Sequence, residues 1–371
     1  MTNSTKGVLL ITPFFAPNIG GVETHLTDLV NELNRLKYPI YVHTYSPLTT
    51  PDTKWKPKET IGNIHIRRYL WPGKNIFHHV EKYPILDFVY LTPYLFLRTF
   101  FWMLKNHLKI NVIHSHGFNG AVCGVVLAKI FSKKHLTSTH ALYSNQPNSL
   151  TAKISRFILN QTDIILVQSV ESEKQLLSWG VKKDKIKPYR YWIDPQKFNT
   201  KNTKPHSKFT VIFVSRLIQK KGTRIVTKLA KQMPKINFIM IGSGPESEFI
   251  QKHLVPNLNF VGKVNNDQLL DYYSQSDIFI QPALYQEGFT RTIMEAVSSG
   301  LPVIASNIGT IPEIVDSTVS VLVKPTVNNF KKAINTLHQN PKILEQMKQN
   351  CPKYTKKYFN PKNIKQITKH F

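Results

Sequence analysis

The sequence predicts an α/β protein with two Rossmann-like domains. Its 371 residues exceed what one hydrophobic core usually supports. Short apolar runs, expected of parallel strands buried on both faces, alternate with segments of helical periodicity. A polar, aperiodic stretch at 199–207 separates two such series and predicts a linker. We expect the two domains to face a central cleft, with a ligand at the carboxyl ends of the strands.

The first series, 1–198, is expected to form the first Rossmann-like domain. The apolar run at 7–12 predicts a buried strand, and apolar residues at helical spacing over 22–36 predict an amphipathic helix. A second helix is predicted at 120–131. Further strands are predicted at 40–45, 110–114, 135–139 and 163–168.

The second series, 208–345, restarts the same alternation and predicts a second Rossmann-like domain. Its strands are predicted at 209–215, 237–241, 277–281, 302–306 and 319–323. The tail, 346–371, is predicted to be helical, with breaks at Pro352 and Pro361, and to pack back on the first domain.

The charge balance is strongly basic. Lys and Arg number 49 against 22 Asp and Glu, a net charge of +27. Such a field attracts nucleotides, anionic lipid headgroups or nucleic acid, although a solvated lysine-rich surface would give the same count. The charge is spread along the chain, so a dedicated nucleic-acid tail is not indicated.

Cysteine usage and hydropathy bear on the compartment. Cys123 and Cys351 lie far apart and give no disulfide framework, which favours a reduced, cytosolic setting. Segment 88–104 is apolar but has only 17 residues and contains Pro93 and Arg98, which is short for a membrane span. We expect it to pack in the core or to lie on a membrane surface as an amphipathic helix.

A pair of glutamates frames the most informative segment. Glu287 lies in the loop after the strand at 277–281, and Glu295 lies about two turns inside a short helix that ends at Gly300. The first backbone N–H groups of that helix lie between them and suit a phosphate. Carboxylates beside an anion site suit a sugar nucleotide, with its hydroxyls and diphosphate.

Basic and glycine-rich loops follow other predicted strands. Arg216 and Lys221 follow the first strand of the second domain, where two cations would neutralise a diphosphate; a solvated basic turn is the alternative. Gly242 begins a Gly-Ser-Gly turn that allows close backbone approach. Gly20 and Gly21 stand at a helix start in the first domain, where their N–H groups can face a ligand.

Histidines follow strands of the first domain. His140 closes one strand and is expected to face the cleft, whereas His114 and His116 fit structural or acceptor-side roles. The sequence contains no ligand set with metal spacing and no Asp-x-Asp pair. We therefore expect no bound metal and no cofactor apart from a nucleotide-sugar co-substrate.

Taken together, these motifs resemble the retaining glycosyltransferases of family 4, which have the GT-B fold. The resemblance covers nearly the whole chain, in the family's order. The matching segments are Gly20-Gly21-Val-Glu23, Ile113-His-Ser-His116, Arg216 to Gly222, Gly242-Ser-Gly-Pro245, Glu287-x7-Glu295 and Asn307 to Glu313.

The resemblance implies that 1–198 is the acceptor-side domain and 208–345 the nucleotide-sugar-binding domain, and it gives each matching residue a role. Arg216 and Lys221 would hold the donor diphosphate and stabilise the leaving group, and Glu287 and His140 would contact the donor sugar as further catalytic residues. Glu295 would accept hydrogen bonds from the ribose. The remaining donor contacts would come from Gly20, Gly21, Gly242, Val264, Gly288, Phe289 and Thr290.

The resemblance implies a metal-independent enzyme that moves a sugar from a UDP-, GDP- or ADP-linked donor to a glycan or lipid-linked acceptor. Its expected place is the cytoplasm, with possible attachment to the inner face of an anionic membrane, and no nucleic acid is expected as a partner. One departure is Tyr191-Trp192, where many members have Asn-Gly, which predicts a different hinge geometry. The alternatives are a GT-B-fold sugar-nucleotide epimerase and a basic membrane- or nucleic-acid-binding protein. A glycoside hydrolase fits less well, because Glu287 and Glu295 are offset along a helix.

Overall fold

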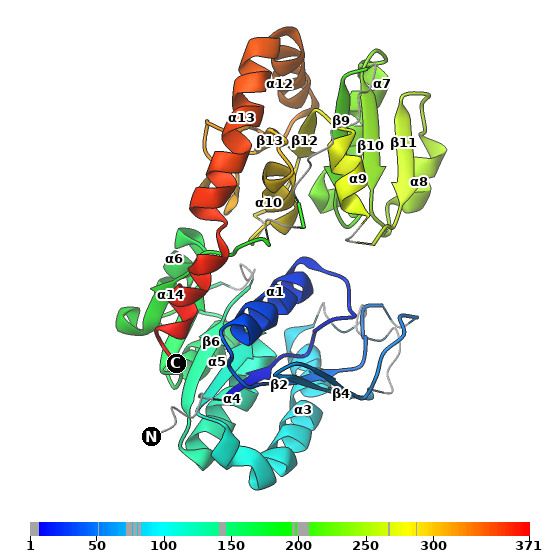
Figure 1. Cartoon of the computed structure of the whole chain (residues 1–371). Helices are drawn as coiled ribbons and strands as arrows, with labels where there is room; N and C mark the ends of the chain where they lie inside the picture. The colour runs from blue at the N-terminus through cyan, green and yellow to red at the C-terminus, as the bar shows by residue number, and fades with distance from the viewer. Residues whose placement is uncertain are drawn as a thin grey trace. The chain divides into compact units, whose positions relative to one another are not determined.

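The computed structural model divides the chain into two compact α/β units (Figure 1). Unit 1 comprises residues 1–192 and 361–371, and unit 2 comprises residues 193–360. The structure describes residues 7–50, 52–71, 76, 80, 83–140, 146–194, 197–198, 208–265, 268–286 and 288–371.

Unit 1 is built on an eight-stranded sheet with the order β3-β4-β2-β1-β5-β6-β7-β8. Every neighbouring pair is parallel except β3 and β4, which form an antiparallel edge. The strands are β1 (Val8–Ile11), β2 (Ile40–Tyr45), β3 (Lys58–Ile61), β4 (Ile64–Tyr69), β5 (Val112–His116), β6 (Lys134–Ser138), β7 (Ile164–Val167) and β8 (Ile186–Pro188).

Helices cover both faces of this sheet. The connection from β1 to β2 runs along the sheet in the opposite direction to the connections after β4, β5 and β6. Right-handed crossovers therefore place α1 on one face and α3, α4 and α5 on the other. The helices are α1 (Gly21–Arg35), α3 (Pro84–Asn106), α4 (Gly117–Phe131), α5 (Leu150–Leu159) and α6 (Val170–Ser178).

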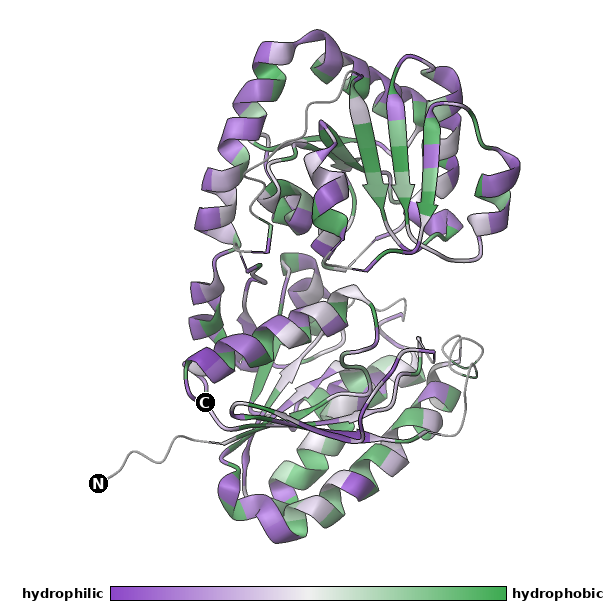
Figure 2. Ribbon diagram, turned by 45° about the vertical axis from the view of Figure 1, so that its right-hand side comes forward, coloured by the Kyte–Doolittle hydropathy of each residue, from purple (hydrophilic) through white to green (hydrophobic). Residues whose placement is uncertain are grey.

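Unit 2 has a six-stranded, fully parallel sheet with the order β11-β10-β9-β12-β13-β14. Its strands are β9 (Thr210–Val214), β10 (Asn237–Ile241), β11 (Leu258–Gly262), β12 (Ile278–Gln281), β13 (Val303–Ser306) and β14 (Ser320–Val323). Its helices are α7 (Thr223–Gln232), α8 (Ser247–Lys252), α9 (Leu269–Ser274), α10 (Arg291–Ser298), α11 (Ile311–Ile314), α12 (Val327–Gln339) and α13 (Pro341–Tyr358). Apolar residues of the strands, green in Figure 2, form the hydrophobic core with residues of the helices packed on the sheet.

The sequence-based predictions agree with most of the described architecture, whereas the predicted linker at 199–207 lies outside the described residues. The strands predicted from continuous apolar runs are all present, and the predicted helices at 22–36 and 120–131 correspond to α1 and α4. The predictions missed β3, β4, β8 and β11. The β3–β4 hairpin carries charged residues such as Arg67 and Arg68, so it presents no apolar run to recognise.

The predicted helix break at Pro352 is wrong. Helix α13 continues through this proline to Tyr358. Cys351, Tyr354 and Thr355 are buried on either side of it, and α13 packs against α10. Tertiary packing of this face therefore outweighs the loss of one helical hydrogen bond. Pro361, in contrast, begins a new 3₁₀ turn.

The last eleven described residues, 361–371, belong to unit 1. The backbone N–H of Arg190 donates to the side-chain oxygen of Gln366 at 2.9 Å, and Asn363 donates to the carbonyl of Tyr191 at 3.3 Å. The ring of Phe371 packs edge-on against Tyr38, with centroids 5.5 Å apart. Unit 1 is therefore assembled from two separate pieces of the chain.

Each sheet has one point where the strand order reverses. In unit 2 this switch point lies between β9 and β12, and in unit 1 it lies between β1 and β5. Loops that leave adjacent strands there diverge to opposite faces and leave room for a ligand at the carboxyl edge. The loops after these four strands carry most of the residues that the sequence singled out.

A matched pair of glycine substitutions tests the close packing at the unit 2 switch point. Gly222 and Gly300 have φ angles of 82° and 83°, so alanine is strained at both positions. A β-carbon at Gly222 would also collide with the carbonyl of Pro282, whereas one at Gly300 would meet open space. We expect Gly300→Ala to lower the free energy of unfolding by about 1 kcal/mol and Gly222→Ala by about 3 kcal/mol or more. Urea denaturation measures both, and equal losses would contradict the close approach.

Candidate functional site

The two loops at the unit 2 switch point are joined through their backbones. The loop after β9 contains Arg216 and Lys221, and the loop after β12 begins at Pro282. The N–H of Leu284 donates to the carbonyl of Lys220 at 2.8 Å. Gly222 lies against Pro282 so closely that no side chain fits between them. This contact fixes the basic loop beside the segment that leads to α10.

Two positive charges lie on this edge. Arg216 is exposed, and Lys221 is partly buried with its Nζ 5.4 Å from the centre of the Tyr285 ring. An ammonium over an aromatic face is held by a cation–π attraction. The structure thus places both predicted cations in the loop at the carboxyl end of β9, with Lys221 beside the loop that follows β12.

The glycine turn after β10 supports the same loop. Gly242 and Gly244 have φ angles of 138° and 157°, where other residues are rarely found. The carbonyl of Ser243 accepts a hydrogen bond of 2.9 Å from the N–H of Leu217. A β-carbon at Gly242 would collide with the carbonyl of Ser215. The close approach predicted here is thus to the Ser215–Leu217 backbone. Val264, from the loop after β11, is partly buried on the same edge.

The segment before α10 is described apart from Glu287, which lies outside the described residues. Gly288 and Phe289 are partly buried, and Thr290 is the buried N-cap residue of α10. The carbonyl of Gly288 accepts a hydrogen bond of 2.7 Å from the hydroxyl of Thr310, which follows β13. The segment that contacts the basic loop at Pro282 and Leu284 thus leads into the N-terminus of α10 at the carboxyl edge of the sheet.

Glu295 has a partner that sequence reasoning missed. Its carboxylate is 3% exposed and lies 3.0 Å from Nε of Arg291, which is 4% exposed. The hydroxyl of Tyr273 donates to the other carboxylate oxygen at 3.4 Å. Burial and the neighbouring charge of Glu295 raise the pKa of Tyr273 well above its usual range, which keeps this donor protonated. The i, i+4 spacing of Arg291 and Glu295 on a predicted helix was the sequence signal from which this ion pair could have been predicted.

In unit 1, the start of α1 already holds a carboxyl group. Gly20 is extended, with φ at −179°, and a β-carbon there would collide with the carboxylate of Glu23. Glu23 is buried, and this burial raises its pKa. Gly21 is exposed and is the first residue of the helix. Because Gly20 has no side chain, the carboxylate of Glu23 can pack directly against its backbone.

A chain of buried rings lies at the carboxyl ends of β5 and β6. Nδ1 of His116 and Nε2 of His140 are 2.9 Å apart, and Nδ1 of His140 lies 2.5 Å from the Tyr191 hydroxyl. The Tyr191 ring stacks on His25, with centroids 3.5 Å apart. Trp192 packs edge-on against the same imidazole at 5.2 Å. Tyr191 thus fixes one side of His140, and Trp192 packs on the His25 ring that Tyr191 stacks against.

Burial makes these imidazoles uncharged. It lowers the pKa of His114 to about 3 and that of His140 to about 3, and it holds the pKa of His116 well below its usual range. Neutral imidazoles donate one hydrogen bond and accept another. Among the residues that the structure describes, no three His, Cys, Asp or Glu side chains are grouped as metal ligands. The cluster is suited to orienting a polar group by hydrogen bonds.

Two family profiles match the chain, one on each unit. "Glycosyltransferase Family 4" matches residues 19–197, and "Glycosyl transferases group 1" matches residues 194–354. Together they cover the chain from the loop before α1 to α13. The chain belongs to the family 4 glycosyltransferases.

Known proteins agree with this assignment. The chain is 25% identical over 340 residues to a subunit of the human phosphatidylinositol N-acetylglucosaminyltransferase, covering 88% of this chain and 67% of the relative. Sucrose-phosphate synthase from Thermosynechococcus elongatus superimposes with a TM-score of 0.79 at 20% identity, over 98% of both chains. HepE from Anabaena, in complex with UDP and glucose, gives a TM-score of 0.76 at 17% identity, over 98% of both chains. The predicted GT-B fold is confirmed.

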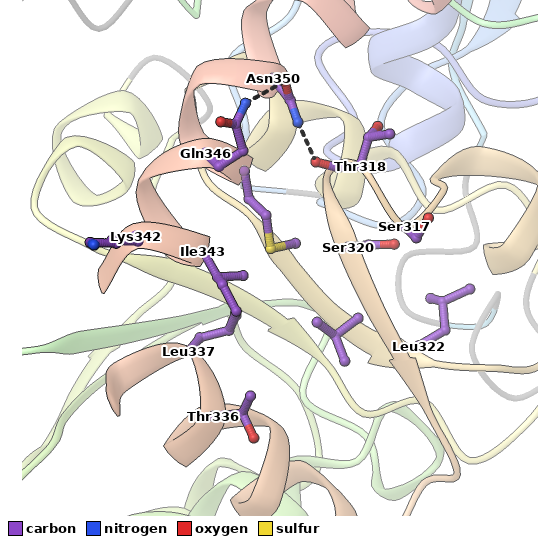
Figure 3. Close-up of a pocket in the computed structure, with 12 residues that line it drawn as sticks. Ser317, Thr318, Ser320, Leu322, Thr336, Leu337, Lys342, Ile343, Gln346 and Asn350 are labelled. Carbon is purple, nitrogen blue, oxygen red and sulfur yellow. Dashed lines mark hydrogen bonds between the residues drawn. The ribbon is translucent and has the colours of Figure 1, made fainter. Parts of the chain in front are cut away.

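This glycosyltransferase also has an apolar pocket away from the switch point. It has a volume of about 680 Å³ and lies along the edge strand β14, between α12 and α13 (Figure 3). Leu322, Leu337, Ile343 and Met347 line it, with Lys342 as its one cationic side chain. None of the predicted site residues contributes to it. Its lining lacks the paired cations and glycine turns that suit a nucleotide diphosphate.

No helix in the described part of the glycosyltransferase is both long and apolar enough to cross a bilayer. The apolar segment 88–104 belongs to α3, which buries Leu91, Leu95 and Met103 in the core of unit 1.

The buried histidines predict a loss of stability on acidification. His114, His135 and His140 have folded pKa values of about 3, against an unfolded value near 6.5. Between those values the unfolded chain binds more protons, so the free energy of unfolding falls as the pH falls, by about 1.4 kcal/mol per unit for each histidine. Urea denaturation between pH 6.5 and 5 measures the slope. His135→Gln should lower the slope of the free energy of unfolding against pH by the contribution of one histidine. A slope equal to that of the wild type would contradict the burial of His135.

The buried Arg291–Glu295 pair gives a second prediction. Arg291→Met strands a buried carboxylate and should lower the free energy of unfolding by about 3–5 kcal/mol. The double variant Arg291→Met/Glu295→Met should recover most of that loss. Lys252→Met is the matched control, because it removes an exposed i, i+4 pair with Glu248 at 2.6 Å and should cost about 0.5 kcal/mol or less. A loss of similar size in both single variants would argue against a buried pair.

Proposed function

We propose that the protein is a retaining, metal-independent hexosyltransferase. It moves a sugar from a UDP-, GDP- or ADP-linked donor to a glycan or lipid-linked acceptor in cell-surface glycan or glycolipid synthesis. The observation that carries the proposal is the unit 2 switch point. There, backbone contacts hold the loop of Arg216 and Lys221 against the segment that leads into α10.

The donor diphosphate would bind at that point. Arg216 is exposed and can reach a phosphate with two parallel N–H groups, while Lys221 contributes a second charge from its place beside Tyr285. The N–H groups of Phe289 and Thr290 lead into α10, whose dipole favours an anion. As the glycosidic bond to phosphate breaks, negative charge grows on the leaving diphosphate. These fixed donors would stabilise it in the transition state.

The remaining donor contacts follow the family pattern. Glu295 would bind the ribose hydroxyls, oriented by Arg291 and Tyr273. Glu287 would accept hydrogen bonds from the sugar, and the backbone at Val264 would meet the base. Attack on the same face as the departing phosphate would retain the anomeric configuration, with that phosphate accepting the acceptor's proton. With Arg216 and Lys221 neutralising the diphosphate, the transfer would need no metal.

Unit 1 would supply the acceptor side. His140 is an uncharged imidazole held by His116 and Tyr191, so it can orient a sugar or acceptor hydroxyl without adding charge. Gly20 and Gly21 would approach the diphosphate, with Glu23 lying directly behind Gly20.

The relatives suggest which substrates to test first. The human relative is named for transfer of N-acetylglucosamine to phosphatidylinositol, and the HepE structure contains UDP. We therefore propose a UDP-linked sugar as donor and a lipid-linked acceptor. With such an acceptor, the protein would act in the cytoplasm, attached peripherally to the inner face of a membrane.

Nucleotide release tests the transferase directly. Purified protein is incubated with a panel of nucleotide sugars and a membrane-lipid extract in EDTA. Release from one donor that depends on the extract supports the proposal. Conversion of a donor into an isomer without any acceptor would favour a GT-B-fold epimerase instead. No release and no donor-induced thermal stabilisation would overturn the proposal.

The basic pair gives the sharpest prediction. Arg216→Ala and Lys221→Ala should each lower kcat/KM by about 10²–10³, because each removes a donor to the leaving diphosphate. Arg216→Lys should recover part of the loss. Lys231→Ala, an exposed lysine in the last turn of α7, is the matched control and should leave activity unchanged. Full activity of both Arg216→Ala and Lys221→Ala would exclude this diphosphate site.

A further inference from the structure

Helix α3 carries an unbroken apolar stripe on its outer face. The buried side of the helix packs into unit 1, but a second row of apolar residues recurs at every third or fourth position, which places it on one face. Leu108 is 85% exposed and Phe101 is 62% exposed. The stripe comprises Leu86, Val89, Pro93, Leu97, Phe101 and Leu104 of α3 and Leu108 of the 3₁₀ turn His107–Lys109 that follows it, all exposed.

Neighbouring helices extend this stripe. Helices α3, α4 and α5 cover the same face of the sheet, and α4 contacts both of the others. The ring of Phe131, at the end of α4, lies 5.4 Å from that of His107, just after α3. Exposed apolar side chains on α4 are Val126 and Ile130, and those on α5 are Leu150, Ile154 and Phe157. Figure 2 shows green segments along α3 at the lower edge of unit 1.

The charges carried by the stretch that contains these helices are almost all positive. Residues 84–159 contain eight lysines and arginines and a single acidic residue, Asp87. Asp87 accepts a hydrogen bond from Asn119 at 2.9 Å. Lys105, Lys109, Lys129, Lys134, Lys153 and Arg156 are exposed on or directly after the three helices. The side chain of Lys129 reaches Gln161, after α5, at 2.6 Å, so the basic ends of α4 and α5 lie together.

We infer that the outer face of α3–α5 docks on an anionic lipid bilayer. This inference deepens the peripheral attachment proposed above and rests on it. Apolar side chains on an amphipathic surface partition into the acyl boundary, while flanking lysines bind anionic headgroups. The near absence of acidic residues favours a surface of uniform negative charge. The length of the stripe, from Leu86 to Leu108, fits a helix lying in the plane of the interface.

Vesicle flotation tests the docking surface without using the transfer reaction. The full chain is mixed with vesicles of phosphatidylcholine alone or with about 30% phosphatidylglycerol. We expect flotation with the anionic vesicles, weaker flotation with the neutral ones, and loss of binding at high salt. Phe101→Ser/Leu104→Ser/Leu108→Ser should lower the bound fraction about tenfold, and Lys105→Glu/Lys109→Glu should do the same for anionic vesicles only. All five side chains are exposed, so the variants should keep the wild-type thermal midpoint.

The control and the contrary outcomes are distinct. Leu254→Ser/Ile343→Ser alters two equally exposed apolar residues of unit 2 and should float like the wild type. Wild-type protein that stays unbound, or a triple variant that floats normally, would overturn the inference. A stable dimer that the triple variant abolishes, without vesicle binding, would assign the face to a second copy of the chain. Release of nucleotide with a water-soluble acceptor should be unchanged in the triple variant. Loss of flotation and failure of the transferase are therefore separate results.

Discussion

The arrangement of unit 2 depends on how closely its backbone segments approach one another at the strand switch point. Strands β9 and β12 pair over a short register, Val211 with Ile278 and Ile212 with Phe279. Beyond it, Gly222 lies against Pro282 and Gly242 against Ser215. Any side chain at these glycines would force the loops apart. The basic loop, the glycine turn and the segment leading into α10 are thus held together by backbone packing, which positions the loop that carries the two cations.

Unit 1 solves the same positioning problem with side chains. His140 is held by hydrogen bonds to His116 and Tyr191, and Tyr191 is itself stacked on His25. All of these rings are largely withdrawn from water, which keeps the imidazoles neutral. A neutral histidine in a fixed orientation presents a defined hydrogen-bonding nitrogen. The bulky Tyr191-Trp192 pair is therefore part of the environment of His140 in this chain.

The sequence was sufficient for the parts of the molecule that are encoded locally. Continuous apolar runs located most of the parallel strands, though not β4, β8 and β11, and glycines and cations directly after them located the switch-point loops. The β3–β4 hairpin was not predicted because both of its strands carry charged residues. The helix break at Pro352 was predicted wrongly because the packing of α13 against α10 is a tertiary effect.

The site was predictable only in part for the same reason. Arg216 and Lys221 follow one strand and are close in sequence, so their common location could be inferred. The residues that hydrogen-bond to Glu295 and His140 could not be inferred from the sequence. Tyr273 and Tyr191 come from distant segments, and only the folded chain brings them to these groups. Glu287 lies outside the described residues, so its role remains a prediction.

The return of residues 361–371 to unit 1 has a consequence for biosynthesis. The ribosome delivers residues 1–192 first, but the segment that contacts Arg190, Tyr191 and Tyr38 emerges only after all of unit 2 has been made. During translation, unit 2 can complete its sheet from one continuous stretch of chain. The surface of unit 1 that residues 361–371 cover stays exposed until those residues have been synthesised. The unit that starts first is thus completed last.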